Sequence, residues 1–296
     1  MSAWRGQQPD ASMTRGSRLL LLTACAMLAF AGNSLLCRLA LKGGHADPAA
    51  FTLIRIASGA AVLWFTLRQR RVERIGGSWT SALALFVYAI AFSFAYTELN
   101  AGTGALLLFG AVQVSMLLAA LMAGERLGPV QGLGLALAVA GLVYLVLPGL
   151  AAPSPEGAVL MVAAGVAWGI YSLRGRRAGD PVAATAGNFL RAVPLAILAT
   201  LLTVSRLEVD TMGWALALAS GVLTSGLGYV IWYAALKGLT ATRAAIVQLS
   251  VPVIAAIGGV LLLSEPLTAR LVLASCVILG GVALAIVGRQ KPALRA

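Results

Sequence analysis

Charged residues are scarce in this sequence, and their scarcity excludes a water-soluble protein. They make up 11% of the 296 residues, whereas hydrophobic residues make up 60% and the mean hydropathy is +0.91. A soluble domain carries roughly 25% charged residues. Since no water-soluble core of this length could hide so much apolar surface, lipid must surround most of the chain.

Residues that build metal, redox and hydrolytic sites are also few. The single histidine, His45, lies in a polar loop, which excludes a multi-histidine metal site. Cys25, Cys37 and Cys276 all fall inside apolar runs, as small buried hydrophobes do, rather than as disulfide partners. The ten acidic residues lie in tails, loops or helix ends, so no serine–histidine or paired-aspartate site is expected at membrane depth. We expect no enzyme, cofactor or metal.

The apolar runs are long enough to cross a bilayer ten times. A membrane helix needs about 20 apolar residues, with a range of roughly 17–25. Seven uncharged intervals of 18 to 29 residues meet this need, and three more runs are short or carry an arginine. The expected fold is therefore an all-α integral membrane bundle of ten transmembrane helices, at about residues 19–41, 49–67, 78–97, 101–123, 129–147, 157–173, 183–204, 212–236, 241–263 and 268–288.

The first apolar run has some features of a cleavable signal. Arg15 and Arg18 precede it, and an Ala-Phe-Ala motif at 29–31 mimics a cleavage site. However, the run continues to Leu41, which is longer than such a signal needs. We expect this segment to be retained as the first membrane helix.

The basic residues predict the orientation in the membrane. With a cytoplasmic N-terminus, sixteen of the 22 Lys and Arg fall in cytoplasmic segments, three fall in outside segments and three lie within spans. The positive-inside rule then places both termini in the cytoplasm. Because the net charge of +12 comes from loop clusters rather than one basic face, no nucleic-acid partner is expected. We expect a multi-pass protein of a bacterial cytoplasmic (inner) membrane.

Two segments of the chain share one layout. Residues 103–146 and 243–286 each contain an apolar run, a charged break and a second apolar run. A shift of 140 residues lays Glu125 on Glu265 and keeps a glycine sixteen residues later in register. This layout predicts an internal repeat.

The repeat divides the chain into two halves, residues 1–150 and 151–296, with five helices each. Because five is odd, the second half must be inverted relative to the first. Inverted repeats are common in transporters, where the two halves enclose a central site and exchange conformations. We therefore expect a central cavity between the halves.

Short motifs close two of the expected helices. Gly124-Glu125-Arg126-Leu127 ends helix 4 and Ser264-Glu265-Pro266-Leu267 ends helix 9, which also contains Val251-Pro252-Val253. With its two five-helix halves, nearly the whole chain resembles the EamA-type branch of the drug/metabolite transporter superfamily. Helix 4 departs from the family pattern, because Val112 stands where a proline is common.

The resemblance implies a secondary transporter of metabolites, drugs or amino acids. Within the family, the chain resembles bacterial amino-acid exporters, including exporters of aromatic amino acids. The resemblance also implies that helices 1, 3, 4, 6, 8 and 9 line the cavity. The expected partners are a small-molecule substrate and the lipid bilayer, and the expected form is a monomer.

Those helices carry polar and aromatic side chains suited to a cavity wall, since polar groups in a membrane span usually face the protein interior. Helical spacing places Tyr88 and Phe92 on one face of helix 3, and Ser225 and Tyr229 on one face of helix 8. The candidate substrate-binding residues are Asn33, Tyr88, Phe92, Gln113, Trp168, Tyr171, Ser225, Tyr229, Trp232, Gln248 and Ser250.

Several candidates also have a purely structural interpretation. Asn33 could form an interhelical hydrogen bond, Trp168 could be core packing, and Trp232 could lie at the membrane interface. Pro252 frees the carbonyl of Gln248 from its helical bond, which produces either a polar patch or only a kink. The sequence leaves these alternatives open.

Two arginines occupy matching places early in helices 2 and 7. Arg55 and Arg191 each need a partner or a path to the interface. The predicted topology puts Arg55 and Glu265 toward the outside, and Arg191 and Glu125 toward the cytoplasm. We expect these two pairs, and Pro252, to have structural roles.

The leading functional hypothesis is export of amino acids or similar small amphipathic metabolites by alternating access. A largely uncharged cavity rimmed by Tyr, Trp, Asn and Gln suits a zwitterion with an apolar side chain. Because no acid is expected at mid-membrane, transport is expected to be facilitated, unless an end-placed acid such as Glu98 couples it to protons. The alternatives are a multidrug or nucleobase exporter of the same fold, and a channel.

Overall fold

The computed structural model describes residues 15–72, 75–124, 127–149, 151–175, 178–203, 208–239 and 241–288. Nine segments of this part are helical, long and apolar enough to cross a membrane, and a tenth, α3, is a shorter apolar helix of 17 residues. The helices are α1 (Arg15–Lys42), α2 (Pro48–Gln69), α3 (Trp79–Ala95), α4 (Ala101–Met122), α5 (Pro129–Val146), α6 (Pro155–Gly175), α7 (Pro181–Thr203), α8 (Thr211–Ala219), η1 (Ser220–Leu227), α9 (Gly228–Leu236), α10 (Ala241–Gln248), α11 (Ser250–Leu263) and α12 (Ala269–Val287). The all-α membrane fold with ten expected spans is confirmed.

Local sequence explains where the helices begin. The side chain of Asp47 accepts hydrogen bonds from the backbone N–H groups of the first turn of α2, and Ser78, Asp210 and Thr268 cap α3, α8 and α12 in the same way. α2, α5, α6 and α7 each begin with a proline, whose missing N–H is not needed at that position. These signals lie between the apolar runs, so the spans start close to where hydropathy places them.

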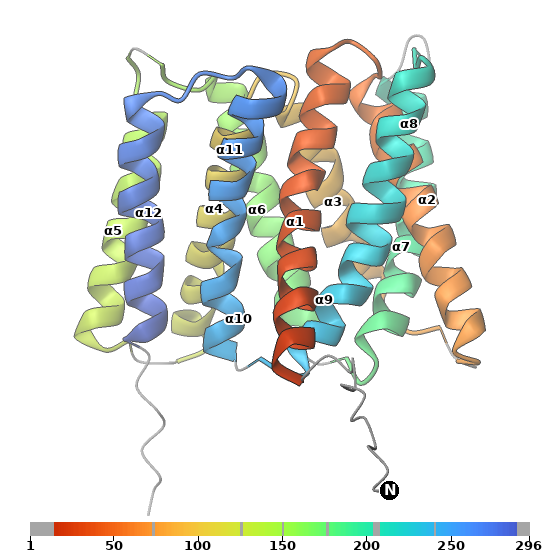
Figure 1. Ribbon diagram of the computed structural model, residues 1–296, viewed down its shortest axis with the longest axis horizontal. Coiled ribbons are helices and arrows are strands. Elements are labelled where there is room, and N and C mark those ends of the chain that lie inside the picture. The colour runs from red at the N-terminus through yellow and green to blue at the C-terminus, as the bar shows by residue number, and fades with distance from the viewer. Residues whose placement is uncertain are drawn as a thin grey trace, which may run out of the picture.

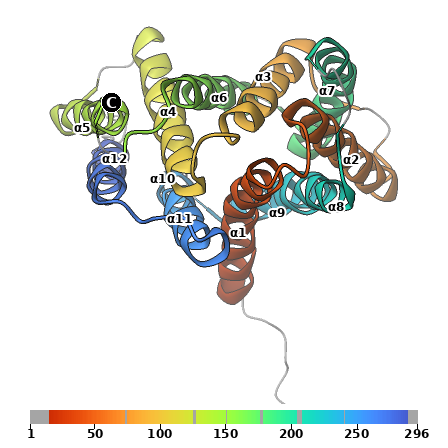
Figure 2. The same cartoon turned by 90° about the horizontal axis from the view of Figure 1, so that it is seen from above.

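The helices stand roughly parallel, and α1 begins on the same side of the bundle as α12 ends (Figure 1). Viewed from above, α4, α6, α3 and α7 form one row, which faces a second row of α11, α1, α9 and α8 (Figure 2). α5 and α12 pack together at one end of the bundle, and α2 packs on α7 at the other.

The packing relates helices that correspond in the two halves. α2 contacts α7, α5 contacts α12 and α4 contacts α11, so equivalent helices meet across the molecule. The contact of α3 with α6 has its counterpart in the contact of α1 with α9. A pseudo-two-fold relation between inverted halves produces this exchange of neighbours.

Two spans of the second half are interrupted. The eighth consists of α8, the π-helical segment η1 and α9. The ninth is broken at Leu249, between α10 and α11, and Pro252 follows without the N–H that would bond to the carbonyl of Gln248. Short π-helical segments such as η1 in the eighth span occur frequently at functional sites.

Gly221 lets η1 lie directly against α2. A Cβ atom at this position would collide with the side chain of Ser58 and the backbone carbonyl of Arg55. The close approach brings Ser225 of η1 into contact with Arg55.

Candidate functional site

A cavity of about 1320 Å³ lies between the two halves. Its mouth is on the side where α1 begins and α12 ends, because Arg70, Asp180 and Lys237, at helix ends on that side, line it. Its closed end lies near the middle of the bundle, at Asn33 and Tyr88. None of the described loop residues on the opposite side lines the cavity.

Ten of the eleven candidate residues line this cavity, in keeping with the helices that the resemblance implies. The exception is Ser250, whose hydroxyl donates to the carbonyl of Val247 at 2.7 Å. Phe30 and Thr224 also line the cavity, although the sequence did not single them out as candidates. Helical spacing could have found both, since Phe30 lies one turn before Asn33 and Thr224 adjoins a candidate.

An aromatic cluster forms the wall around Trp168. The ring centroid of Trp168 lies 4.7 Å from that of Tyr88, 5.3 Å from Tyr171 and 5.4 Å from Tyr229, and the last two rings are stacked on it. Phe30 extends the cluster, with its centroid 6.0 Å from that of Tyr229. These rings offer flat faces to an apolar group or a cation.

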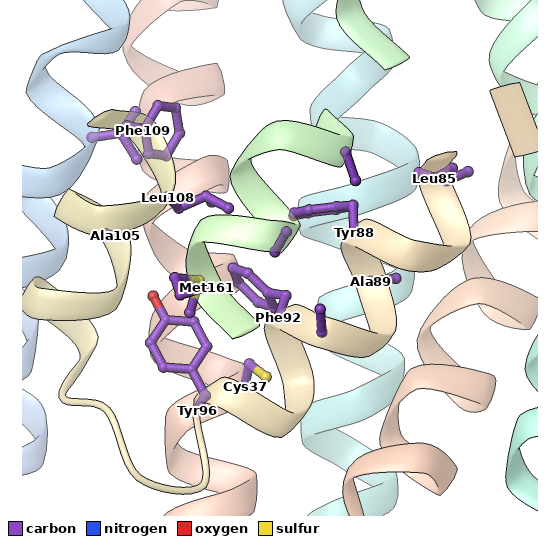
Figure 3. Packing of buried hydrophobic residues seen from close by; sticks show 14 of the residues in the cluster. Cys37, Leu85, Tyr88, Ala89, Phe92, Tyr96, Ala105, Leu108, Phe109 and Met161 are labelled. Atoms are coloured by element: carbon purple, nitrogen blue, oxygen red, sulfur yellow. The ribbon is translucent and has the colours of Figure 1, made fainter. Parts of the chain in front are cut away.

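Tyr88 and Phe92 project from the same side of α3 as Tyr96 (Figure 3). Tyr88 and Phe92 line the cavity, whereas Tyr96 is fully buried beyond it and donates to the carbonyl of Ala101 at 3.3 Å. The aromatic stripe therefore begins as cavity wall and ends as packing on the closed side.

Asn33 combines the two roles that the sequence left open. Its Nδ2 donates to the Tyr88 hydroxyl at 3.3 Å, and its Oδ1 accepts from Ser220 at 2.7 Å and Thr224 at 3.2 Å. The residue thus ties α1 to α3 and η1 while also lining the cavity. By contrast, Gln113 and Gln248 line the cavity with amides that bond to none of the described residues.

Arg55 lies immediately behind the closed end of the cavity. It is 2% exposed, and it donates from Nε to Ser225 Oγ at 3.1 Å and from Nη2 to Tyr88 Oη at 2.9 Å. Its guanidinium carbon lies 5.2 Å from the Tyr88 ring centroid and 5.1 Å from that of Phe92. Nη1 is buried without a hydrogen-bond partner among the described residues.

The expected pairing of Arg55 with Glu265 is wrong. Glu265 Oε1 instead bonds to Nε of Arg38 at 3.0 Å, and both side chains are buried. Arg55 lies seven residues into α2, roughly 10 Å along the helix from its outer end, whereas Glu265 follows the end of α11. Arg38 is one turn from the end of α1 and therefore matches Glu265 in depth.

The Arg38–Glu265 pair closes the side opposite the mouth. Arg38 Nη1 also donates to the carbonyls of Tyr96 and Thr97, both at 2.9 Å. Glu265 Oε2 accepts from the backbone N–H of Ala101 at 2.8 Å, at the start of α4. The pair therefore joins α1, the α3–α4 connection and the end of α11 in one buried network.

A second contact joins the loops on that side. Nδ1 of His45 lies 2.8 Å from Oδ2 of Asp210, and an isolated β-bridge pairs Ala46 with Val209. Two hydrogen bonds lower the pKa of the Asp210 carboxyl below its ordinary value: the bond from the backbone N–H of Gly213 has the larger effect, and the bond with His45 has the smaller one. The α1–α2 and α7–α8 connections are thereby held together.

The other predicted pair is Arg191 with Glu125, and Glu125 lies outside the described residues. Arg191 donates from Nη1 to the carbonyls of Gly76 and Gly187, both at 2.9 Å. It does not line the large cavity.

A model of the EamA-like transporter family matches residues 17–147 and again residues 155–287. A protein of Pseudomonas aeruginosa described as uncharacterized is 56% identical over 280 residues, which are 94% of this chain and 98% of that protein. An uncharacterized transporter of Archaeoglobus fulgidus is 27% identical over 264 residues, or 84% of this chain and 90% of that protein.

A relative with a named activity matches a shorter stretch. The threonine/homoserine exporter RhtA of Salmonella typhimurium is 30% identical over 161 residues, which are 51% of this chain and 52% of the exporter. One solved crystal structure superposes on 93% of this chain and on 98% of its own chain, with a TM-score of 0.65. Because the two sequences are only 22% identical, this similarity shows the fold alone. Since the family model matches both halves, the chain belongs to the EamA-like transporter family.

Proposed function

We propose that this transporter exports amino acids or similar small amphipathic metabolites across the bacterial cytoplasmic membrane by alternating access. The observation that carries the proposal is the one-sided cavity, which both halves line and which ends near mid-bundle. The predicted topology makes its mouth cytoplasmic, so the structure corresponds to a state that loads substrate from inside. The cytoplasmic termini and the division between residues 150 and 151 are parts of this proposal.

The chemistry of the wall supports a small amphipathic substrate. Trp168, Tyr171 and Tyr229 supply stacked aromatic faces, while Gln113 and Gln248 supply amides that bond to none of the residues that the structure describes. The exporter of threonine and homoserine in Salmonella typhimurium, although similar over only half of this chain, is consistent with this class of substrate.

We propose facilitated transport, down the gradient of the substrate. Among the described residues that line the cavity, the acid is Asp180, and it lies at the mouth rather than at mid-membrane. A carboxylate buried at the substrate site would be the usual carrier of a coupling proton. If uptake into liposomes depended strongly on an imposed proton gradient, this part of the proposal would be wrong.

The test of the function is reconstitution into liposomes and counterflow of a labelled amino acid. We expect saturable counterflow that unlabelled amino acids compete away, with threonine, homoserine, leucine and phenylalanine in the panel. Failure of every amino acid to compete would contradict the proposal. Competition by chemically unrelated drugs or nucleobases at similar concentrations would favour a multidrug or nucleobase exporter instead, and flux without saturation would indicate a channel.

A further inference from the structure

The closed end of the cavity holds a buried positive charge without a carboxylate. Arg55 is 2% exposed, and the ion pairs among the described residues are Arg38 with Glu265 and His45 with Asp210. Asp180 cannot be the carboxylate partner of Arg55, because it lies at the mouth of the cavity whereas Arg55 lies behind the closed end. An arginine inside a membrane span is costly and normally has a partner, so the unpaired guanidinium points to a ligand.

The two hydroxyl groups that accept hydrogen bonds from Arg55, those of Tyr88 and Ser225, still have their own protons to donate. Tyr88 Oη accepts from Arg55 Nη2 at 2.9 Å and from Asn33 Nδ2 at 3.3 Å, and Ser225 Oγ accepts from Arg55 Nε at 3.1 Å. Neither hydroxyl donates its own proton to a described residue. Both side chains line the cavity, so their O–H groups are available to a molecule inside it.

The hydroxyls and the Arg55 guanidinium together form a cluster of hydrogen-bond donors for which the described residues supply no acceptor. The set contains the two hydroxyls in the cavity wall and, directly behind them, the unpartnered Nη1 of Arg55. A carboxylate accepts several hydrogen bonds at once, and bonds between ionised partners are the strongest that side chains make. A single guanidinium balances a monocarboxylate, whereas a phosphate dianion would need a second cation.

We infer that Arg55, Tyr88 and Ser225 form a subsite for the carboxylate of the transported molecule, which defines the substrate as a monocarboxylate. This inference rests on the proposed function in taking the cavity as the transport site. The carboxylate bonds to the hydroxyls of Tyr88 and Ser225 and faces the Arg55 charge behind them. The rest of the substrate lies toward Trp168 and Tyr229, whose faces suit an apolar group or an ammonium.

The test compares ligands that differ only in the carboxylate. Purified protein in detergent is titrated with leucine, phenylalanine and 3-phenylpropionate, and with the primary amide of each, in which an uncharged carboxamide replaces the carboxylate. Thermal stabilisation and tryptophan fluorescence report binding. We expect the acids to bind and the amides to bind at least tenfold more weakly. Equal binding of acid and amide in every pair, or binding by none of the acids, would overturn the inference.

Three variants locate the effect. In Arg55→Gln, affinity for the acids should fall roughly tenfold to a hundredfold while affinity for the amides stays unchanged, because the buried positive charge that faces the carboxylate is lost. Arg55→Lys should retain part of the preference. Arg191→Gln, which removes the matching arginine of the other half outside the cavity, should behave like wild type.

A variant that keeps the charge guards against misfolding. Tyr88→Phe preserves Arg55 and the ring packing but removes one hydroxyl donor, and it should weaken binding of the acids more than of the amides. Wild-type affinity for the acids in folded Arg55→Gln would overturn the inference. If 3-phenylpropionate bound through Arg55 but no amino acid bound or exchanged, the subsite would stand and the proposed amino-acid export would fail.

Discussion

Two buried arginines show how depth in the bundle determines the partner of a charged residue. Arg38 lies one turn before the end of α1 and reaches Glu265, which follows the end of α11. Arg55 lies deeper, in α2, and among the described residues its side chain contacts hydroxyls and aromatic rings rather than a carboxylate. A guanidinium can extend its reach only by the length of its side chain, so residues at unequal depths on rigid helices do not meet.

Removing one partner of the Arg38–Glu265 pair should destabilise the protein. In Arg38→Met the Glu265 carboxylate stays buried with only a backbone N–H as partner, which costs roughly 3–5 kcal/mol. Thermal unfolding in detergent should show a marked fall in melting temperature.

The matched control is the double variant Arg38→Met with Glu265→Gln, which removes both charges of the pair. It should recover much of the lost stability, because no unpaired charge remains buried. Equal melting temperatures for the single and double variants would show that the lone carboxylate is not the cause.

Trp168 should contribute to selection among substrates. Trp168→Ala removes the ring that packs against Tyr88, Tyr171 and Tyr229, and each aromatic contact is worth about 0.5–1.5 kcal/mol. We expect the half-saturation concentration for an aromatic amino acid in counterflow to rise roughly tenfold, with a smaller change for threonine. Trp214→Ala, at an exposed site on α8, should change neither value.

At the scale of elements, the two interrupted spans lie in the second half and border the cavity. η1 contributes Thr224 and Ser225 to the wall, and α10 contributes Gln248 just before the break at Leu249. Departures from regular α-helix leave backbone groups available and allow local bending. These two spans are therefore the elements best suited to bend in the proposed alternating-access cycle.

The close contact of η1 with α2 gives a prediction at this scale. Gly221→Ala should destabilise the protein by about 1–3 kcal/mol, because the added methyl group collides with Ser58 and with the backbone of Arg55. Gly280→Ala, in α12, meets no atom within 4 Å and should be neutral or stabilising. Melting temperatures in detergent test both, and equal values for the two variants would contradict the close contact.

At the scale of the whole molecule, the cavity and its closed end form only where the two halves pack together. The first half lines the cavity with residues of α1, α3, α4 and α5, and the second half lines it with residues of α6, α7, η1, α9, α10 and α12. Its closure on one side also depends on both halves, because Arg38 and Glu265 are 227 residues apart in the chain. The proposed alternating access would require the Arg38 network to open as the mouth closes.

The sidedness of the cavity can be measured by thiol labelling. With Cys25, Cys37 and Cys276 replaced by alanine, a cysteine at Gln113 in the cavity should react with an impermeant reagent in inside-out vesicles and not in right-side-out vesicles. A cysteine at the exposed Lys42 should show the opposite pattern. Equal labelling at Gln113 from both sides would contradict the outer closure.

Sequence patterns determined much of this protein. Hydropathy located the ten spans, with no end displaced by more than four residues. Polar and aromatic groups on the helices that the family resemblance implies gave eleven candidates, ten of which line the cavity. Both signals are local, because a residue's distance from water and its face on a helix follow from its near neighbours in the chain.

The tertiary structure alone decided which buried groups meet. In the folded protein Glu265 pairs with Arg38, and Arg55 has no carboxylate partner among the described residues. The packing of the helices also closes one end of the cavity. These outcomes depend on the relative depth and rotation of helices that are far apart in sequence. A single sequence contains no local signal for that geometry, since it arises only when the two inverted halves pack together.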